Sequence, residues 1–198
     1  MNAIPDLPAP PESLYREAYQ TLMKAFEPSR VFCAWLDAPF GPVFLARTAK
    51  GICRLSFRRS EDELLGELEG RSLLPEMAQG KLERERRELG EYFQGKRRRF
   101  EVPIDLRWGT EFQRSVLQAA SRIPFGERRS YAEVAKRLGR PKAQRAVGSA
   151  LGKNPVPIVI PCHRVVASGG GIGGYTGGID IKRTLMEIEG IELEERRR

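Results

Sequence analysis

The sequence has few of the residues that build metal sites, disulfides or membrane spans. It contains one histidine, His163, and three cysteines, Cys33, Cys53 and Cys162. Three cysteines cannot all pair with one another, so a reduced, cytoplasmic protein is the simplest interpretation. No apolar run is long enough to cross a bilayer. Residues 1–12 carry prolines and acids, where a secretory signal needs a basic segment followed by an apolar one. We therefore expect no membrane association.

Net charge is absent from the first half of the chain. Residues 1–106 contain 17 Lys+Arg and 17 Asp+Glu, whereas residues 107–198 contain 17 and 9. The whole excess of +8 therefore lies in the second half. A general bias toward basic residues, suggested by 26 Arg against 8 Lys, would not leave the first half neutral. A one-sided basic half indicates a polyanion partner, most commonly nucleic acid.

The most informative segment surrounds Cys162. This cysteine follows the apolar, strand-like run 158–161 and precedes the single histidine, His163. A thiol reacts as its thiolate, and a neighbouring base or positive charge makes the thiolate accessible near neutral pH. A Cys-His dipeptide alone is more often a core thiol beside a surface histidine. The interpretation therefore depends on the surrounding segments.

The first hundred residues predict a small α/β unit. A proline-rich arm and a short helix precede three strands that read as an antiparallel meander. Ser60-Glu61-Asp62-Glu63 is a capping box that opens a helix, and a charged second helix follows. The elements are expected at residues 14–26 (helix), 31–36, 43–47 and 51–57 (strands), and 77–93 (second helix).

The second half predicts a helix-turn-helix. A capping box at 110–113 begins one helix, and a further box at Ser130 begins another that runs to Leu138. Gly139-Arg140-Pro141 fits a three-residue turn, with the proline in the first turn of a helix over 142–151. Two short helices with a glycine-containing turn are the helix-turn-helix pattern, although many such hairpins never touch DNA.

A glycine-rich loop occupies residues 168–178, before a closing helix over 181–189. It lacks the GK[ST] ending of a nucleotide P-loop. Glycines let a ligand approach the backbone closely, so this loop is a candidate wall of a small pocket near Cys162.

Taken together, these segments resemble the O6-alkylguanine-DNA alkyltransferases, also called methylated-DNA–protein-cysteine methyltransferases. The resemblance covers residues 105–190 closely, whereas the first hundred residues match only in their order of strands and helices. The matching motifs, in chain order, are the box at Thr110, Ile123-Pro124-Phe125-Gly126-Glu127, Ser130-Tyr131, Arg145-Ala146-Val147-Gly148, Asn154-Pro155, Pro161-Cys162-His163-Arg164-Val165, Gly174-Tyr175-Thr176-Gly177-Gly178, Lys182 and Glu189-Gly190.

The resemblance implies an α/β (α+β) fold. An N-terminal, ribonuclease-H-like small antiparallel sheet with helices would be followed by a C-terminal, mostly helical domain with a winged-helix-like helix-turn-helix. The expected divisions are an arm and short helix at 1–30, the α/β domain at 31–104, the DNA-binding and alkyl-acceptor domain at 105–190, and a charged tail at 191–198.

The resemblance also implies a reaction, in which an alkyl group moves irreversibly from guanine O6 in duplex DNA to the Cys162 sulfur. His163 would take the thiol proton through a water, and Glu189 would orient the histidine. Tyr131 would donate toward a guanine ring nitrogen, and Asn154 would brace the loop and polarise the site. The substrate pocket is expected to include Tyr131, Pro157, Val165, Tyr175, Thr176 and Lys182.

The target atom lies inside the duplex, so the nucleotide must be flipped out of the stack. The resemblance places the second helix of the hairpin in the minor groove, with Arg145 inserted where the base was. Binding should be mostly non-specific and salt-dependent. The residues expected to contact DNA are Arg145, Lys142, Gln144, Ala146, Gly148 and Ser130.

Some relatives bind zinc in the first half or carry a cysteine-rich regulatory domain. Here only Cys33 and Cys53 occur in the first half, and structural zinc normally needs four ligands. We therefore expect no metal, no cofactor and no transcription-activating role. A monomer is expected.

Three alternatives remain at this point. One is a non-catalytic, alkyltransferase-like protein that binds lesions, although such relatives replace the acceptor cysteine. Another is a helix-turn-helix regulator with an incidental cysteine. The third is a cysteine hydrolase, which is disfavoured because adjacent residues rarely form a nucleophile–base pair in direct contact.

Overall fold

The structure is a computed structural model, described for residues 11–18, 29–169 and 171–192. Residues 12–18 are helical and exposed, so the start of the predicted helix over 14–26 is present and its remainder lies outside the described residues. Within the described ranges, no helix is both long and apolar enough to span a membrane.

Three strands form the predicted antiparallel meander, and a fourth strand joins it. Strands β1 (Ser29–Ala38), β2 (Gly41–Thr48) and β3 (Gly51–Phe57) pair in sequence, and β4 (Leu73–Met77) pairs parallel to β1 at the edge. The sheet is therefore mixed, not purely antiparallel as predicted. The sequence pattern missed β4 because Pro75 interrupts it, and an edge strand is where a sheet tolerates proline.

The two faces of the sheet pack into two different hydrophobic clusters. On one face, Leu64 and Leu68 of α2 (Glu61–Glu69) pack against Cys33, Phe44 and Cys53. The opposite face contributes alternate residues of the same strands to a second, larger core. That larger core also contains side chains of α3 (Glu83–Phe93), which follows a short 3-10 turn, η1 (Gln79–Leu82). The helix predicted from residue 77 starts later because Met77 ends β4.

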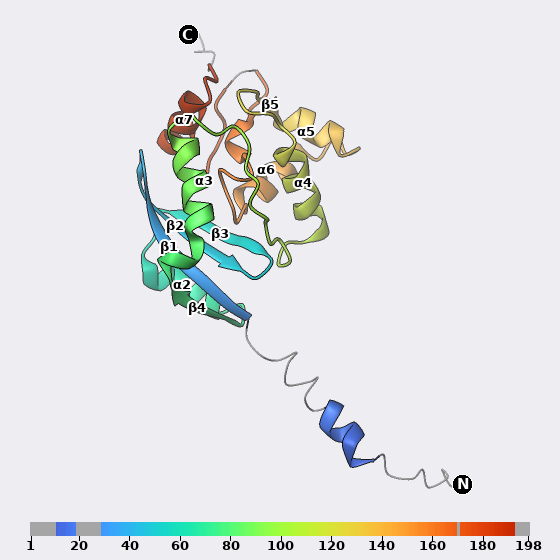
Figure 1. The fold of residues 1–198 in the computed structure, drawn as a ribbon. Helices are drawn as coiled ribbons and strands as arrows, with labels where there is room; N and C mark the ends of the chain where they lie inside the picture. Colours follow the sequence, from blue (N-terminus) through green and yellow to red (C-terminus); the bar gives the residue numbers. More distant parts are fainter. Residues whose placement is uncertain (1–10, 19–28, 170, 193–198) are drawn as a thin grey trace, which may run out of the picture.

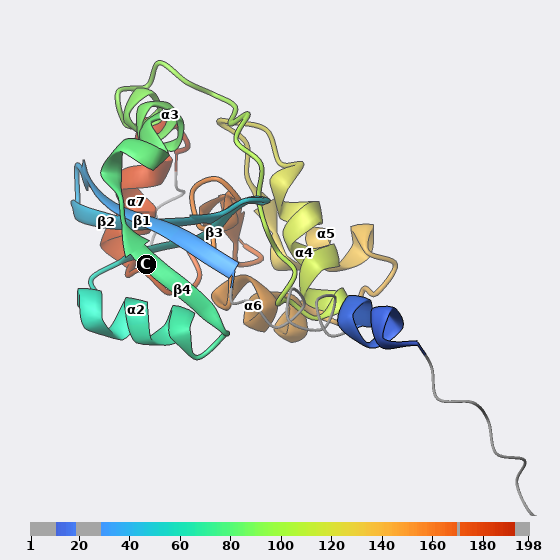
Figure 2. The same ribbon diagram turned by 60° about the horizontal axis from the view of Figure 1, so that its bottom comes forward.

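The second half is mostly helical and lies beside β3, at one edge of the sheet (Figures 1 and 2). The elements are α4 (Glu111–Ser121), β5 (Arg129–Ser130), α5 (Tyr131–Arg137), α6 (Gln144–Gly152), η2 (Cys162–Arg164), β6 (Val165–Val166) and α7 (Ile179–Ile188). The short strands β5 and β6 pair in parallel and connect the start of α5 to the segment after Cys162.

Helices α5 and α6 form the predicted helix-turn-helix, with one correction. Gly139 adopts the expected left-handed conformation, with φ of 70°. However, α6 begins at Gln144, so Pro141 lies in the connection and not in the first turn of the helix. The amide of Ala143 donates to the carbonyl of Arg140, which makes a separate turn over Pro141 and Lys142 before the helix starts.

The capping boxes at Ser60 and Ser130 are complete, but the one at Thr110 is only half formed. Thr110 accepts from the Gln113 amide as predicted. The Gln113 side chain instead donates to the carbonyl of Lys153 at 2.9 Å. This residue therefore ties α4 to the end of α6, which leads into the segment before Cys162.

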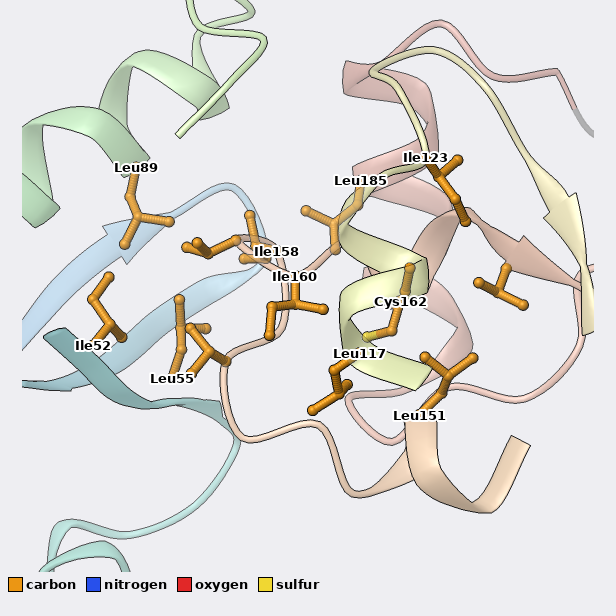
Figure 3. Close-up of a cluster of buried hydrophobic side chains, with 14 of the residues drawn as sticks. Ile52, Leu55, Leu89, Leu117, Ile123, Leu151, Ile158, Ile160, Cys162 and Leu185 are labelled. Carbon is orange, nitrogen blue, oxygen red and sulfur yellow. The ribbon is translucent and has the colours of Figure 1, made fainter. Parts of the chain in front are cut away.

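The two halves share one core along the outer edge of β3. The amide of Ile52 donates to Pro103 O, and the amide of Leu55 donates to Pro155 O, at 2.9 and 2.8 Å. In Figure 3, Ile158 and Ile160 lie between the sheet residues on one side and the helices on the other. The edge strand is thus covered partly by residues 103–105, at the end of the first half, and partly by Pro155 of the second half. This cover also excludes pairing with other chains.

The run before Cys162 is buried but is not the strand that its apolar character suggested. Only an isolated bridge between Pro157 and Ile160 forms there. Proline lacks the amide that a ladder needs, and Ile158 has φ of 75°, outside the extended region. The side chains of Ile158, Val159 and Ile160 pack into the core, while the backbone turns sharply before it reaches Cys162.

The close contact between β3 and residue 103 generates a test at Gly51. Its φ is +143°, and a Cβ there would lie 2.3 Å from Pro103 O. We expect Gly51→Ala to lower the free energy of unfolding by about 3 kcal/mol, measured by denaturant titration. Gly66→Ala, in α2 where a Cβ meets open space, should instead stabilise by roughly 0.5–1 kcal/mol. Equal effects of the two substitutions would contradict this account of the contact between β3 and residue 103.

Candidate active site

Cys162 begins the 3-10 turn η2 and is 8% exposed. The side-chain amide of Asn154 holds it in place. Its Nδ2 donates to Ile160 O at 2.9 Å and to Cys162 Sγ at 3.1 Å, while its Oδ1 accepts from the amide of Val156 at 3.0 Å. Asn154 therefore both shapes the segment before the cysteine and directs a donor at the sulfur.

Burial raises the pKa of the Cys162 thiol above its ordinary value. The Asn154 amide, the nearby charge of Lys182 and the Tyr175 hydroxyl act in the opposite direction, without cancelling the effect of burial. At neutral pH the resting sulfur is therefore protonated. A base must remove the proton before the sulfur can act as a strong nucleophile.

His163 is fully buried and is held by Glu189. Its Nε2 lies 2.7 Å from Glu189 Oε1, which places the proton on Nε2 in the neutral ring. Its Nδ1 is buried without a hydrogen-bond partner among the described residues. Burial lowers the pKa of His163, so the ring is neutral at pH 7 and its Nδ1 lone pair is available to accept a proton.

Glu189 follows the C-terminal end of α7, where the helix dipole disfavours a negative charge. Two nitrogens of the buried Arg164 offset this: Nε donates to Oε2 at 2.7 Å and Nη2 donates to Oε1 at 2.9 Å. The amide of Gly126 adds a longer bond at 3.3 Å. The net result is a pKa of about 2 for Glu189, with the His163 and Arg164 hydrogen bonds outweighing desolvation.

Two members of this network were not predicted. Tyr92 of α3 donates its hydroxyl proton to Glu189 Oε1 at 2.7 Å, and Arg164 also donates to the Ile123 carbonyl at 2.5 Å. Arg164 belongs to the motif around Cys162, so its place in the sequence could have identified it as a member of the site. Tyr92 has no comparable local signal, because it lies 97 residues from Glu189 in a helix dominated by charged residues.

Tyr131 stands at the first turn of α5 between two glycines. A Cβ at Gly148 of α6 or at Gly173 of the glycine-rich loop would lie 3.7 or 3.2 Å from its ring. The hydroxyl donates weakly to Gly174 O at 3.4 Å. Burial raises the pKa of Tyr131, and the proximity of Cys162 acts in the same direction, so the hydroxyl remains a proton donor.

The glycine-rich loop brings Tyr175 and Thr176 to the site. Burial raises the pKa of Tyr175 well above its usual value. Its buried hydroxyl has no partner that meets hydrogen-bond geometry among the described residues. Its ring stacks on Phe57 of β3, with 6.3 Å between centroids. Gly177 permits this stack, since a Cβ there would meet the Phe57 ring at 2.3 Å. The Thr176 hydroxyl donates to Gly152 O at 2.7 Å.

Lys182 of α7 is fully buried beneath the same loop. Its ammonium group donates to Val165 O and Ile172 O, each at 2.6 Å. Burial lowers the pKa of Lys182 to about 8. Lys182 therefore joins the segment after Cys162 to the glycine-rich loop and places a positive charge near the sulfur.

A cavity of about 680 Å³ runs along the junction of the two halves, and Cys162 is part of its wall. Tyr175, Thr176, Pro157 and Asn154 also line it, together with Leu55 and Phe57 of β3. Tyr131, Val165 and Lys182, which we expected in the same pocket, are not among the lining residues. They surround the thiol from the side of the helix-turn-helix and the glycine-rich loop.

The expected DNA-contacting residues divide into two groups. Lys142, Gln144, Arg145 and Ala146 are exposed, and neither Lys142 nor Arg145 has a carboxylate partner within the described part of the chain. Gly148 is half-buried against Tyr131. Ser130 is engaged in capping α5, because its hydroxyl and amide both bond the Glu133 side chain.

The residues that the structure describes contain no group of three or more His, Cys, Asp or Glu side chains placed to hold a metal ion. Cys33 and Cys53 are buried in the core between the sheet and α2, and both are free thiols. Burial raises the pKa of each to about 12, so both thiols stay protonated at neutral pH.

A thiol beside a buried histidine–carboxylate pair, next to a helix-turn-helix, is the combination expected of a DNA-directed transferase that uses cysteine. Residues 111–191 match the family model for the DNA binding domain of 6-O-methylguanine DNA methyltransferase, and residues 31–106 match that for its ribonuclease-like domain. The chain therefore belongs to the methylated-DNA–protein-cysteine methyltransferase family, as its motifs predicted.

Individual relatives agree with the family models. The methylated-DNA–protein-cysteine methyltransferase of Methanosarcina acetivorans is 37% identical over 166 residues, which are 81% of this chain and 99% of the relative. That of Mycolicibacterium paratuberculosis is 52% identical over 102 residues, 52% of this chain and 61% of the relative.

Solved structures also confirm the predicted fold class. Mycobacterium tuberculosis O6-methylguanine methyltransferase matches with a TM-score of 0.70 at 38% identity, over 83% of this chain and 96% of that one. The structure of M. tuberculosis OGT in complex with DNA matches with a TM-score of 0.67 at 38% identity, over 80% and 92% of the two chains.

The pKa shifts at this site predict that acid destabilises the fold. The lowered pKa of His163 contributes stability above pH 6.5 that is lost as the pH falls below it. The Glu189 pKa of about 2 contributes stability above its ordinary 4.5 that is lost between pH 4.5 and 2, amounting to roughly 3 kcal/mol at most. We therefore expect the free energy of unfolding, measured by urea titration, to fall from pH 7 to pH 3. A free energy that stays constant or rises over this range would contradict this.

Proposed function

We propose that this protein repairs DNA by transferring an alkyl group from O6 of guanine in duplex DNA to Cys162, which is consumed in the reaction. The observation that carries the proposal is the arrangement at one cavity wall. Cys162 Sγ accepts a hydrogen bond from Asn154, while the adjacent His163 is held by Glu189, and its Nδ1 has no hydrogen-bond partner among the residues that the structure describes. This is the arrangement of a nucleophile, a base and an orienting group.

The thiol proton leaves first. His163 is neutral at pH 7, and its Nδ1 accepts the proton through a water. The imidazolium so formed lies against the ionised Glu189, which stabilises the positive charge. The Asn154 amide and the charge of Lys182 stabilise the thiolate that remains. Deprotonation therefore separates charge between two groups that each have a partner.

The thiolate then attacks the alkyl carbon in line with the C–O6 bond. The S–C bond forms as the C–O6 bond breaks, and the bonding pair leaves with the guanine. Tyr131 donates a hydrogen bond toward a guanine ring nitrogen, which stabilises the negative charge on the departing base. Tyr175, Thr176, Pro157 and Val165 would hold the base in the pocket. The thioether formed is stable, so each molecule acts once.

The exposed face of α6 supports the DNA-binding part of the proposal. Arg145 has no carboxylate partner in the described ranges, so its charge is available to a phosphate or to the space left by a flipped base. Lys142 and Gln144 would flank it. We place the alkyl acceptor and DNA contacts in residues 105–190. The protein would act as a monomer, without cofactor or metal, in the cytoplasm, where thiols stay reduced.

The three alternative functions differ from this proposal in the role that each gives to the Cys162 thiol. A lesion sensor or a transcription regulator has no use for a cysteine with an amide donor and a buried base beside it. A hydrolase needs a base in direct contact with the sulfur, whereas the hydrogen bond that the structure gives Cys162 Sγ comes from Asn154. Alkyl transfer is the chemistry that uses each of these groups.

The acceptor can be identified by intact-protein mass measurement after mixing with duplex DNA carrying one O6-methylguanine. We expect the wild type to gain one methyl group, stoichiometrically and on the Cys162 peptide, with no further gain from fresh DNA. Cys162→Ala should bind the duplex but gain no mass. Methylation of Cys33 or Cys53 would refute the assignment, and lesion binding without any mass gain would favour the sensor.

The role of Arg145 is tested by comparing two substrates. We expect Arg145→Ala to slow transfer from duplex DNA at least about tenfold, and to leave reaction with free O6-methylguanine base nearly unchanged. The control Arg87→Ala removes the same charge from the neutral half of the chain and should leave the rate of transfer from both substrates unchanged. If Arg145→Ala reduces both reactions equally, the residue acts on the pocket and not on the duplex.

A further inference from the structure

The carboxylate that holds the only histidine receives a hydrogen bond from the other half of the chain. Tyr92 lies in the last turn of α3, between the sheet and the second half, and its side chain is fully buried. Its hydroxyl donates to Glu189 Oε1 at 2.7 Å, the same oxygen that faces His163 Nε2 at 2.7 Å. The oxygen of Tyr92 is also 3.5 Å from His163 Nε2.

The position of the Tyr92 proton determines what the histidine can do. Since the hydroxyl proton points at Glu189, the Tyr92 oxygen presents lone pairs to Nε2. His163 Nε2 therefore faces two acceptors, a carboxylate oxygen and a phenol oxygen. Both favour a proton on Nε2, which leaves Nδ1 as the acceptor in the neutral ring. Arg164 is the other charged group at this carboxylate, and it donates to Glu189 and not to the ring.

Aromatic packing fixes the Tyr92 ring so that its hydroxyl reaches this point. Phe93, Phe100 and Phe125 surround the ring, with centroids 5.7, 5.4 and 6.3 Å away. Phe125 belongs to the loop after α4, and Phe100 to the segment after α3. A tyrosine kept only for packing would not need its hydroxyl buried against a charged carboxylate, since phenylalanine fills the same space without a polar group to satisfy.

We propose that Tyr92 is a positioning residue for alkyl transfer: its hydroxyl, supplied by the N-terminal half, fixes Glu189 and the Nε2–H tautomer of His163 so that Nδ1 can take the Cys162 proton. The inference rests on the proposed function, because the proton transfer that it assists belongs to that reaction. It gives the N-terminal half a part in the chemistry in addition to its part in the core.

Removal of the hydroxyl has a defined chemical effect. In Tyr92→Phe, Glu189 loses a charge-assisted donor, and Nε2 loses one of its two acceptors. Glu189 Oε1 is then held less firmly against Nε2, so the population of the Nδ1–H tautomer, in which Nδ1 no longer accepts a proton, rises. We expect the rate constant of transfer at saturating duplex DNA to fall about tenfold or more, while the affinity for DNA stays within about twofold.

The chain offers a direct spectroscopic measurement, because His163 is its only histidine. Long-range ¹H–¹⁵N correlation spectra of tag-free, ¹⁵N-labelled protein then contain one imidazole, and its pattern identifies the tautomer. We expect a pure Nε2–H pattern in the wild type above pH 7, and a mixed or Nδ1–H pattern in Tyr92→Phe. This measurement needs neither DNA nor activity.

Phe44→Leu is the matched control. Phe44 is fully buried in the smaller core on the other face of the sheet, where it packs against Trp35, whereas Tyr92 belongs to the larger core. We expect lower thermal stability with an unchanged tautomer and an unchanged rate constant. If Phe44→Leu and Tyr92→Phe lose rate in proportion to stability, the role of Tyr92 is structural and the inference is wrong.

The outcomes separate this inference from the proposed function. A wild type that accepts no methyl group refutes the proposed function, whatever its tautomer. A wild type that accepts the methyl group, together with a Tyr92→Phe variant of equal rate and the same imidazole pattern, refutes only the role of Tyr92. A slower variant with a changed imidazole pattern supports both.

Discussion

The buried carboxylate of Glu189 is the group around which the site is built. An ionised acid in the interior requires donors, and here Arg164, His163, Tyr92 and the Gly126 amide converge on it. These donors come from α3, the loop after α4 and the turn η2, so satisfying one charge fixes the relative position of three segments. The orientation of the base beside Cys162 follows from that requirement.

The sulfur itself illustrates a compromise between protection and reactivity. Burial keeps the thiol protonated and away from solvent oxidants, but it removes the solvation that a thiolate needs. The Asn154 amide and the nearby Lys182 charge replace part of that solvation. The same environment therefore keeps the nucleophile inactive at rest and stabilises it once the proton has left.

Local patterns in the sequence predicted the meander, the helix-turn-helix, and Cys162 with His163, because each has a signature within a few residues. The resemblance to a family supplied Glu189 and Asn154. The sequence could not indicate Tyr92, whose partner is 97 residues away, or β4, whose pairing with β1 depends on the finished sheet. The false strand before Cys162 has the same origin, because an apolar run reports burial but not backbone direction.

The two family models match separate halves of the chain, whereas the larger hydrophobic core contains residues from both halves. The larger cluster joins Ile52 and Leu55 of the sheet to Leu117, Ile160 and Leu185 of the second half (Figure 3). Separation of the halves would expose the apolar surface that they share through this cluster. For protein engineering this means that a cut at the family boundary would leave an exposed apolar patch on each fragment, which favours aggregation.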